Sequence, residues 1–316
     1  MKATTTIAAA ILASFVSAPA FAVDWAEVKG TEIVLFYPGQ SSYEWALTPT
    51  AHSGGYKVRE GKNCHQCHIS EEKGKGERLV SGRPLINGET KEPSPIAGKP
   101  GSIAANVKFA RDDKNLYVHL EFAEGTQPDA RMDPEWATKV TMMLSGDGTP
   151  EAQRFGCWSA CHDDDASMPS AGTAQRTKYL GDTRVTSGRQ GGGDVLKSAD
   201  ELAALRAGGY QLEYWQARLN PGAKAVAASG TVFDKRETAR ISAVTADAGL
   251  ANGTWSVTLS RPLIAGAPYR DLLAGKTYTV GFAIHADHTA KRFHYVSFER
   301  TLTLDGTGAD FVAAKQ

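Results

Sequence analysis

Apolar and polar residues alternate along several short stretches of the chain, and this period of two predicts β-strands. In residues 254–259, Trp255, Val257 and Leu259 fall on one face, and residues 277–285 alternate in the same way. Turn residues separate these stretches, as expected for antiparallel strands. The predicted strands are residues 31–37, 103–110, 116–122, 139–144, 210–219, 231–234, 254–259, 277–285 and 293–304.

One helix interrupts the predicted strands. Ser198 and Glu201 form a capping box at its start, and Gly208 suits its C-terminal end. The pattern as a whole therefore predicts a mainly β fold, an antiparallel immunoglobulin-like β-sandwich with few short helices. Residues 41–100 do not fit this pattern, because they are poor in apolar residues and close in a run that contains three prolines. Such a segment is not expected to form a packed core alone.

Residues 1–22 have the pattern of a cleaved secretion signal. Lys2 supplies a positive charge, residues 7–16 are apolar, and Ala20-Phe21-Ala22 is a small-x-small cleavage site. The alternative is a membrane anchor, but about fifteen apolar residues are too few for a comfortable span. We therefore expect a mature chain that begins at Val23, lacks a membrane anchor and is located in the periplasm.

The overall charge excludes some classes of partner. The 316 residues include 35 Lys and Arg and 35 Asp and Glu. No basic excess is therefore present to bind nucleic acid or an anionic membrane surface. The chain has only 4 cysteines, too few for a disulfide scaffold in a protein of this length. We expect them to have a chemical role.

The first pair of cysteines has the attachment signature of a c-type haem. Cys64, Cys67 and His68 follow the pattern C-x-x-C-H. Two thiols at this spacing add to the two vinyl groups of the porphyrin, and the histidine that follows becomes the proximal iron ligand. The alternatives are a redox-active disulfide and half of a zinc site.

The second pair of cysteines is spaced one residue more widely. Cys157, Cys161 and His162 form C-x-x-x-C-H. A strained disulfide and a zinc site shared with the first pair are the alternatives. A second haem is the preferred interpretation, because all four cysteines then belong to units of two cysteines and a histidine. This second group is either another haem c or a non-covalent haem b, with His162 as its proximal ligand.

Each low-spin iron also needs a distal ligand. His52 lies twelve residues before Cys64, next to a glycine-containing turn, and is the candidate for the first haem. For the second haem the turn between the last two predicted strands favours His288 narrowly and then His294. The complete set of candidates for the second iron is His285, His288, His294, Met142 and Met143, with Met168 as a further thioether.

These features predict three parts of the chain. Residues 1–22 are the signal peptide, and residues 23–100 hold an N-terminal strand and the c-type haem segment. Residues 101–316 form a β-sandwich domain that binds haem.

Several stretches together resemble the haem-binding family typified by the gamma subunit of ethylbenzene dehydrogenase, which also contains periplasmic dihaem c-type cytochromes. The resemblance extends over residues 31–304 and rests on order and spacing. The matching stretches are residues 35–40, 61–68, 156–163, 177–180, 213–216, 280–285 and 294–297.

The resemblance implies a β-sandwich with haem held between the sheet edge and loops. It also implies electron transfer, often beside a molybdenum enzyme of the dimethyl-sulfoxide-reductase type. The gamma subunit itself binds a non-covalent b-type haem through methionine and lysine. This chain differs by having Cys157, Cys161 and His162, although Met142 or Met143 and Lys291 occupy candidate positions for such ligands.

The predicted function is that of a periplasmic dihaem c-type cytochrome, an electron carrier in a respiratory chain and not an enzyme. Its expected partner is a redox protein, either a molybdenum oxidoreductase or a membrane cytochrome that oxidises quinol. One alternative is a haem enzyme or ligand sensor with an open iron position. The other is a haem-free secreted β-sandwich that acts as a binding module.

Overall fold

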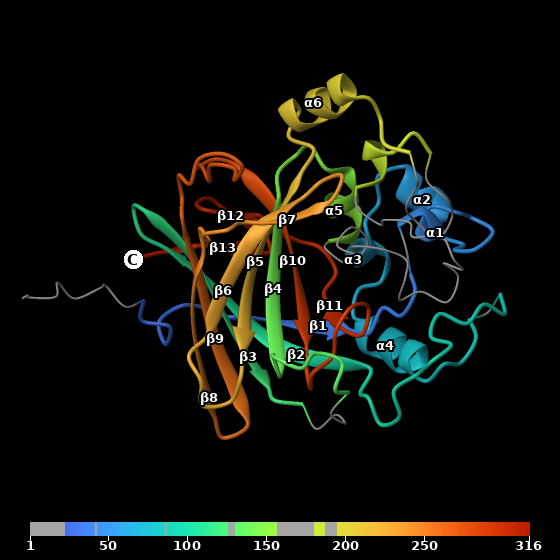
Figure 1. Cartoon of the computed structure of the whole chain (residues 1–316), viewed down its shortest axis with the longest axis horizontal. Helices are drawn as coiled ribbons and strands as arrows, with labels where there is room; N and C mark the ends of the chain where they lie inside the picture. Colours follow the sequence, from blue (N-terminus) through green and yellow to red (C-terminus); the bar gives the residue numbers. More distant parts are fainter. Residues whose placement is uncertain (1–22, 42, 86, 126–129, 157–179, 187–194) are drawn as a thin grey trace, which may run out of the picture.

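The computed structural model describes residues 23–41, 43–85, 87–125, 130–156, 180–186 and 195–316. These residues contain a sheet of 14 strands and several short helices (Figure 1). The strands are β1 (Thr31–Phe36), β2 (Ser102–Arg111), β3 (Asn115–Ala123), β4 (Thr138–Ser145), β5 (Leu212–Leu219), β6 (Val226–Val232), β7 (Arg236–Thr238), β8 (Thr245–Ala251), β9 (Thr254–Pro262), β10 (Thr277–His285), β11 (Tyr295–Val296), β12 (Arg300–Thr303), β13 (Phe311–Val312) and β14 (Ala314–Lys315). The helices are α1 (Tyr43–Ala46), α2 (Gly55–Arg59), α3 (Cys64–Cys67), α4 (Glu72–Val80), α5 (Pro150–Phe155), the 3-10 turn η2 (Gly181–Thr183) and α6 (Ala199–Ala207).

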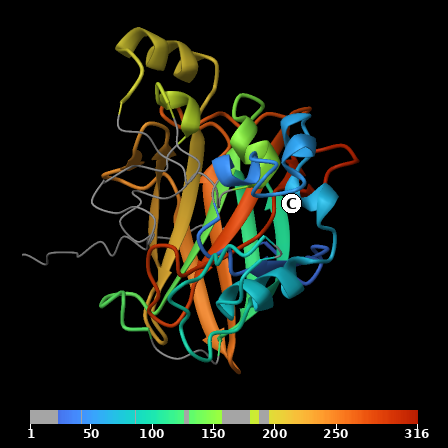
Figure 2. The same ribbon diagram turned by 90° about the vertical axis from the view of Figure 1, so that its right-hand side faces the viewer.

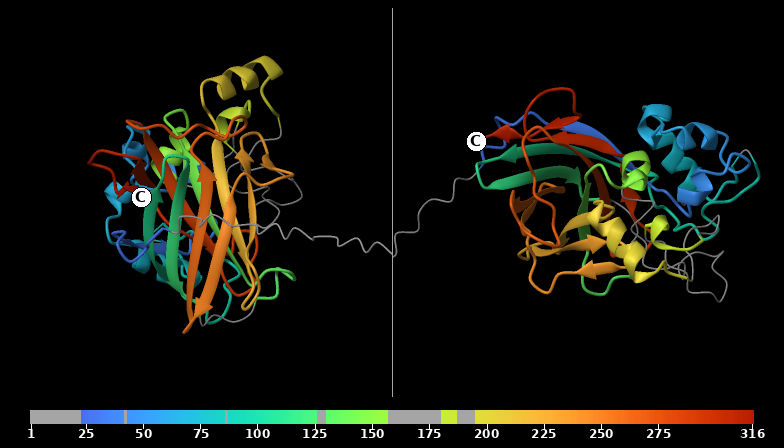
Figure 3. Two further views of the ribbon diagram at one scale, coloured as in Figure 1. Left: turned by 90° about the vertical axis from the view of Figure 1, so that its left-hand side faces the viewer. Right: turned by 90° about the horizontal axis from the view of Figure 1, so that it is seen from above.

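The strands form one continuous sheet in the order β7-β6-β5-β4-β10-β11-β1-β2-β3-β9-β8. Neighbours along this path are antiparallel, while β13 pairs with β12 and β14 pairs with β2 in parallel. The sheet bends so that β8 also contacts β5 and β6. Seen from above, β2 and β3 lie in one layer and β5 and β6 in the other (Figure 3). The predicted class, mainly antiparallel β with few short helices, is confirmed.

The two layers enclose an apolar core, which we call the sandwich core. It includes Val107, Phe109, Val118, Leu120, Val140, Met142, Leu144, Trp215, Val257, Leu259, Phe282 and Ile284. Because side chains alternate along a strand, the neighbours of these residues point to the opposite face of the sheet. That opposite face carries a second apolar group, the outer-face cluster. Its members are Phe36, Ala46, Val58, Cys64, Met143, Ala152, Phe155, Leu180, Tyr210, Leu212, Tyr214, Val232, Phe233, Ala283, Val296 and Phe298.

Most predicted strands agree with the structure within about two residues, and residues 277–285 agree at both ends. The expected strand over residues 293–304 is wrong, because it divides into β11 and β12. Between them the Ser297 hydroxyl accepts a hydrogen bond from the backbone N–H of Phe282 at 2.9 Å, and Phe298 turns into the outer-face cluster. The expected strand at 231–234 begins earlier, at Val226. The predicted helix is α6, and its capping box is present.

The segment over residues 41–100 folds as short helices that lie against one side of the sheet. Figure 2 shows α1 to α4 on this side. Helix α4 contacts β1 and β2. At this contact a Cβ on Gly76 would collide with the carbonyl oxygen of Gly101, so the missing side chain permits the close approach. The buried carboxylate of Glu92 accepts hydrogen bonds from Tyr37 and Arg292, which anchors the end of the segment to the sheet.

Candidate functional site

The first cysteine motif forms the single helical turn α3. Asn63 caps this turn, because its side chain accepts a hydrogen bond from the backbone N–H of Gln66 at 2.8 Å. The side chain of Gln66 in turn accepts one from the backbone N–H of Asn63. The turn ends at His68, whose N–H donates to the carbonyl of Cys64 at 2.9 Å. Residues three and four apart share one face of a helix. The two cysteines and His68 therefore lie together at one cavity.

The cysteines of this motif are unbonded thiols in different surroundings. Cys64 is buried and Cys67 is exposed. Burial raises the pKa of the Cys64 thiol well above its usual value, and the nearby Glu299 carboxyl acts in the same direction. Zinc binding and thiol exchange both require a thiolate. In addition, the described residues contain no group of three or more His, Cys, Asp or Glu side chains arranged to hold a metal ion. The surroundings of Cys64 thus favour a neutral thiol.

The ring of His68 is held from two sides. Its Nδ1 donates to Oε2 of Glu71 at 2.9 Å. Its face lies over Phe298, with ring centroids 6.1 Å apart and an interplanar angle of 25°. Burial, and then the charge of Lys75, lowers the pKa of His68. A neutral imidazole with a proton on Nδ1 presents the lone pair of Nε2, the form that binds a metal ion.

His52 lies near His68 at the same cavity. Its Nδ1 donates to the carbonyl oxygen of Ala46 at 2.8 Å, which leaves Nε2 as the lone-pair nitrogen here also. The two ring centroids are 6.1 Å apart. A Cβ on Gly54 would come within 3.1 Å of the His52 ring, so the glycine makes room for this position of the ring.

The cavity that both histidines line would suit a porphyrin held through His52 and His68. Two imidazoles that bind one metal ion from opposite sides, through bonds of about 2 Å, place their ring centroids roughly 6 Å apart. The cavity measures about 580 Å³, within the usual range for small-molecule sites. Apolar side chains and three cationic ones line it: Phe36, Val58, Leu79, Phe155 and Phe298, with Lys57, Lys75 and Arg78.

The second cysteine motif lies outside the described residues, as do Met168 and the predicted signal peptide. The described stretch nearest in sequence to Cys157, Cys161 and His162 is the one that precedes them and ends at Gly156. Phe155 lines the His52–His68 cavity. Gly156 ends α5, and a Cβ there would lie 3.1 Å from the backbone nitrogen of Glu299. This described stretch therefore ends next to the wall of the first cavity, one residue before Cys157.

The three C-terminal histidines occupy two different surroundings. The rings of His285 and His294 stack, with centroids 4.9 Å apart and an interplanar angle of 17°. His285 Nε2 donates to the carbonyl of Lys291, whereas its Nδ1 is buried with no hydrogen bond among the described residues. His288 lies in the turn, and its Nδ1 donates to the carbonyl of Asp133 at 2.7 Å. His288 is thus held against another loop.

The two methionines of β4 point to opposite faces of the sheet. Met142 belongs to the sandwich core, and Met143 belongs to the outer-face cluster. His285 follows Ala283 by two residues on β10, so it shares the face of Met143. Of the candidates for a second iron, Met143 and His285 therefore lie on the same face of the sheet as the first cavity, whereas Met142 does not.

Three residues of this region had no signal in the patterns considered above. Phe155 and Phe298 reach the cavity from α5 and from the residues after β11. Glu299 is buried and accepts the backbone N–H of His65 at 2.8 Å. These contacts join parts of the chain up to 234 residues apart, which short-range patterns do not report. Glu71 is different, because its position three residues after His68 is a local signal of contact.

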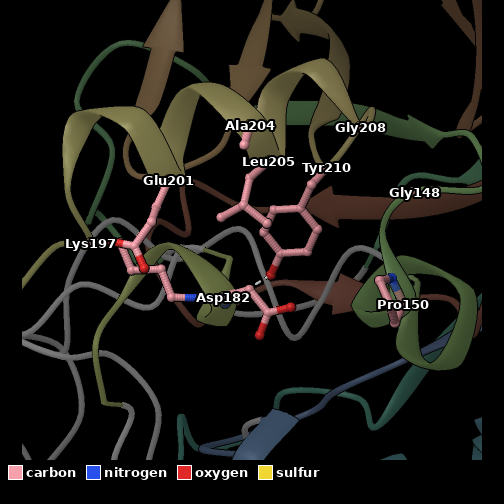
Figure 4. Close-up of a pocket in the computed structure, with 9 residues that line it drawn as sticks. All are labelled: Gly148, Pro150, Asp182, Lys197, Glu201, Ala204, Leu205, Gly208 and Tyr210. Carbon is pink, nitrogen blue, oxygen red and sulfur yellow. Dashed lines mark hydrogen bonds between the residues drawn. The ribbon is translucent and has the colours of Figure 1, made fainter.

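A second hollow of about 480 Å³ lies beneath α6 (Figure 4). Tyr210 accepts the backbone N–H of Asp182 at its floor, and Glu201 is engaged in the capping box of α6. None of the nine residues that line it is a histidine, cysteine or methionine. The His52–His68 cavity is therefore the candidate functional site.

Comparison with known proteins identifies the family of the chain. A family model described as ethylbenzene dehydrogenase matches residues 22–297. Cytochrome c-552 of Stutzerimonas stutzeri is 34% identical over 298 residues, which cover 93% of this chain and 91% of that protein. Cytochrome c-551 of Rhodocyclus tenuis is 28% identical over 295 residues, which cover 93% of this chain and 100% of that protein. The resemblance noted from the sequence is confirmed: the chain belongs to the ethylbenzene dehydrogenase family.

Proposed function

We propose that this protein is a c-type cytochrome that carries electrons and is not itself a catalyst. The observation that carries the proposal is that the rings of His52 and His68, with centroids 6.1 Å apart, both line a cavity that Cys64 and Cys67 also line. Haem held there supplies one-electron exchange at iron. An iron with an imidazole on each side has no open position, which favours a carrier over a haem enzyme or ligand sensor.

The residues of the cavity have separate tasks in this proposal. Cys64 and Cys67 bind the porphyrin edge, and His68 and His52 bind the iron. Phe36, Phe155 and Phe298 cover the ring with apolar surface and exclude water. The cations Lys57 and Arg78 line the same cavity and are suited to pair with the two propionates, whereas Lys75 is paired with Glu71.

A second haem on Cys157, Cys161 and His162 is part of the same proposal, as haem c or as non-covalent haem b. Support comes from the position of Phe155 in the cavity wall, two residues before Cys157 in the sequence. Its proposed distal ligand comes from the face of the sheet that carries Met143, His285 and the stacked ring of His294. His288 remains the alternative from the turn.

The protein is proposed to work in the periplasm after removal of residues 1–22. In the part of the chain that the structure describes, no helix is both long and apolar enough to cross a membrane. The proposed partner is another redox protein, either a molybdenum oxidoreductase or a membrane cytochrome that oxidises quinol. Membership of the ethylbenzene dehydrogenase family and the relatives named cytochrome c support such a partner.

The test is a pyridine haemochrome spectrum with a haem-to-protein ratio, on protein made in a host that matures c-type cytochromes. We expect two haems per chain, both retained after acid–acetone extraction. One retained and one extracted haem would assign haem b to the second motif. Absence of haem would overturn the proposal, and binding of carbon monoxide to the reduced first haem would favour an enzyme or sensor.

A further inference from the structure

The two histidines that line the cavity donate to unlike partners. His52 Nδ1 donates to a neutral backbone carbonyl, that of Ala46, at 2.8 Å. His68 Nδ1 donates to the carboxylate of Glu71 at 2.9 Å. A glutamate side chain in contact with water is ionised at neutral pH, and that of Glu71 is 56% exposed. A haem iron held by these two histidines would therefore have a carboxylate behind His68 and a neutral carbonyl behind His52.

Local backbone structure fixes the position of Glu71. Its N–H donates to the carbonyl of His68 at 3.1 Å, and its own carbonyl accepts the N–H of Lys75 at 2.9 Å. Glu71 is also the residue that precedes α4. The carboxylate is thus held next to the His68 ring by the turn that joins α3 to α4, although the side chain itself is 56% exposed.

Lys75 binds the same oxygen of Glu71 that His68 uses. Its Nζ lies 3.2 Å from Oε2, and the pair is spaced i, i+4 along the chain. Lys75 also lines the cavity. The ammonium withdraws charge from the oxygen that accepts the histidine proton, so it opposes the effect of Glu71 on the ring.

We propose, on the basis of the function proposed above, that Glu71 is a positioning residue that lowers the reduction potential of the first haem through His68. A carboxylate that accepts the N–H of a ligating histidine orients the ring and makes it a stronger donor. A stronger donor stabilises ferric iron over ferrous iron. Lys75 limits this effect, and the pair sets the potential.

The first test is the Glu71→Gln variant, measured by redox titration. Glutamine keeps an oxygen that accepts the His68 proton but removes the charge. We expect the equilibrium constant for reduction of the first haem to rise threefold to tenfold, which is about 30 to 60 mV at 59 mV per tenfold for one electron. The low-spin electron paramagnetic resonance signal of this haem should shift as well, because the donor strength of His68 changes.

Glu77→Gln is the matched control, because Glu77 is an exposed residue of the same helix α4. In the described part of the chain no hydrogen bond joins Glu77 to His68. Its replacement removes an equal charge and should leave the resonance signal unchanged. If both variants shift the potential equally and neither moves the signal, Glu71 acts only as a surface charge and the proposal is wrong.

A second variant, Lys75→Gln, should lower the potential, since Glu71 then acts on His68 without competition. In the double variant the effect of removing Lys75 should shrink, because the two side chains share one oxygen. An additive double variant would contradict the proposal. Two other results would instead overturn the proposed function. One is a protein without covalent haem, and the other is an iron spin state that is unchanged in the His68→Ala variant.

Discussion

The two faces of β4 and β10 are both buried, yet they serve different purposes. On one face Met142 and Phe282 pack in the sandwich core. On the other face Met143 and Ala283 belong to the outer-face cluster, which also contains Cys64. An antiparallel strand with one solvated face alternates between apolar and polar residues. Strands with two apolar faces therefore indicate that another part of the chain covers the second face. Here the segment that contains the first cysteine motif covers it.

The largest difference between the two faces should appear when Cys64 and Cys67 are both replaced with alanine. Each chain should lose one covalent haem, as measured by the haem-to-protein ratio after acid–acetone extraction. The sandwich core does not involve these residues. The far-ultraviolet circular dichroism of the strands should therefore remain. Unchanged haem content would contradict the assignment of this motif.

Two matched substitutions separate the faces directly. Phe282→Ala removes a fully buried ring from the sandwich core, at a cost of about 3–5 kcal/mol in the free energy of unfolding. Phe298→Ala removes the ring that stacks on His68. We expect only the second variant to move the low-spin resonance signal. Denaturant titration and electron paramagnetic resonance measure the two effects, and a shifted signal in the Phe282 variant would erase the distinction.

The buried carboxyl of Glu299 should make the free energy of unfolding of the chain depend on pH. Burial raises the pKa of Glu299 to about 8, whereas an unfolded glutamate titrates near 4.3. Between these values the folded chain binds the proton and the unfolded chain does not. The free energy of unfolding therefore falls as pH rises from about 4.3 to about 8, by at most about 1.4 kcal/mol per pH unit.

Glu299→Gln removes this titration but keeps an acceptor for the N–H of His65. The variant should therefore become more stable relative to the parent protein as pH rises. Denaturant titrations at pH 5 and pH 8 measure it. Parallel pH profiles would mean that Glu299 is ionised in the folded protein.

The smallest effect should come from Gly54→Ala. The added Cβ comes within 3.1 Å of the His52 ring, so the ring must shift by a few tenths of an ångström. We expect a small change in the low-spin signal with full haem content. Gly74→Ala on α4 is the control, since a Cβ there has open space, and it should only stabilise the helix by about 0.5–1 kcal/mol. Equal spectra for both variants would place His52 away from the iron.

Much of the sheet could be predicted because each strand contributes to a core with a period of two. Strand β8 was missed, since its sequence TADAGLA lacks β-branched side chains beyond its first residue and depends on pairing with β9. The short helices α1 to α3 were also missed. Helices of four or five residues have no stability of their own and form only through tertiary contacts.

The residues of the candidate site also divide into those that could be predicted from the sequence and those that could not. Cys64, Cys67 and His68 could be predicted because one helical turn brings them together. His52 was a candidate by its nearness in sequence, and the structure brings its ring to His68. Phe155 and Phe298 could not be found, because their approach depends on how the sheet and α5 pack.

The central claim is that His52 and His68 bind the same iron, and His52→Ala tests it most directly. The low-temperature electron paramagnetic resonance spectrum of the oxidised protein should show one haem converted from low spin to high spin. Covalent haem content should be unchanged, because Cys64 and Cys67 remain. A low-spin spectrum identical to that of the parent protein would contradict the claim and leave the cavity with a different ligand.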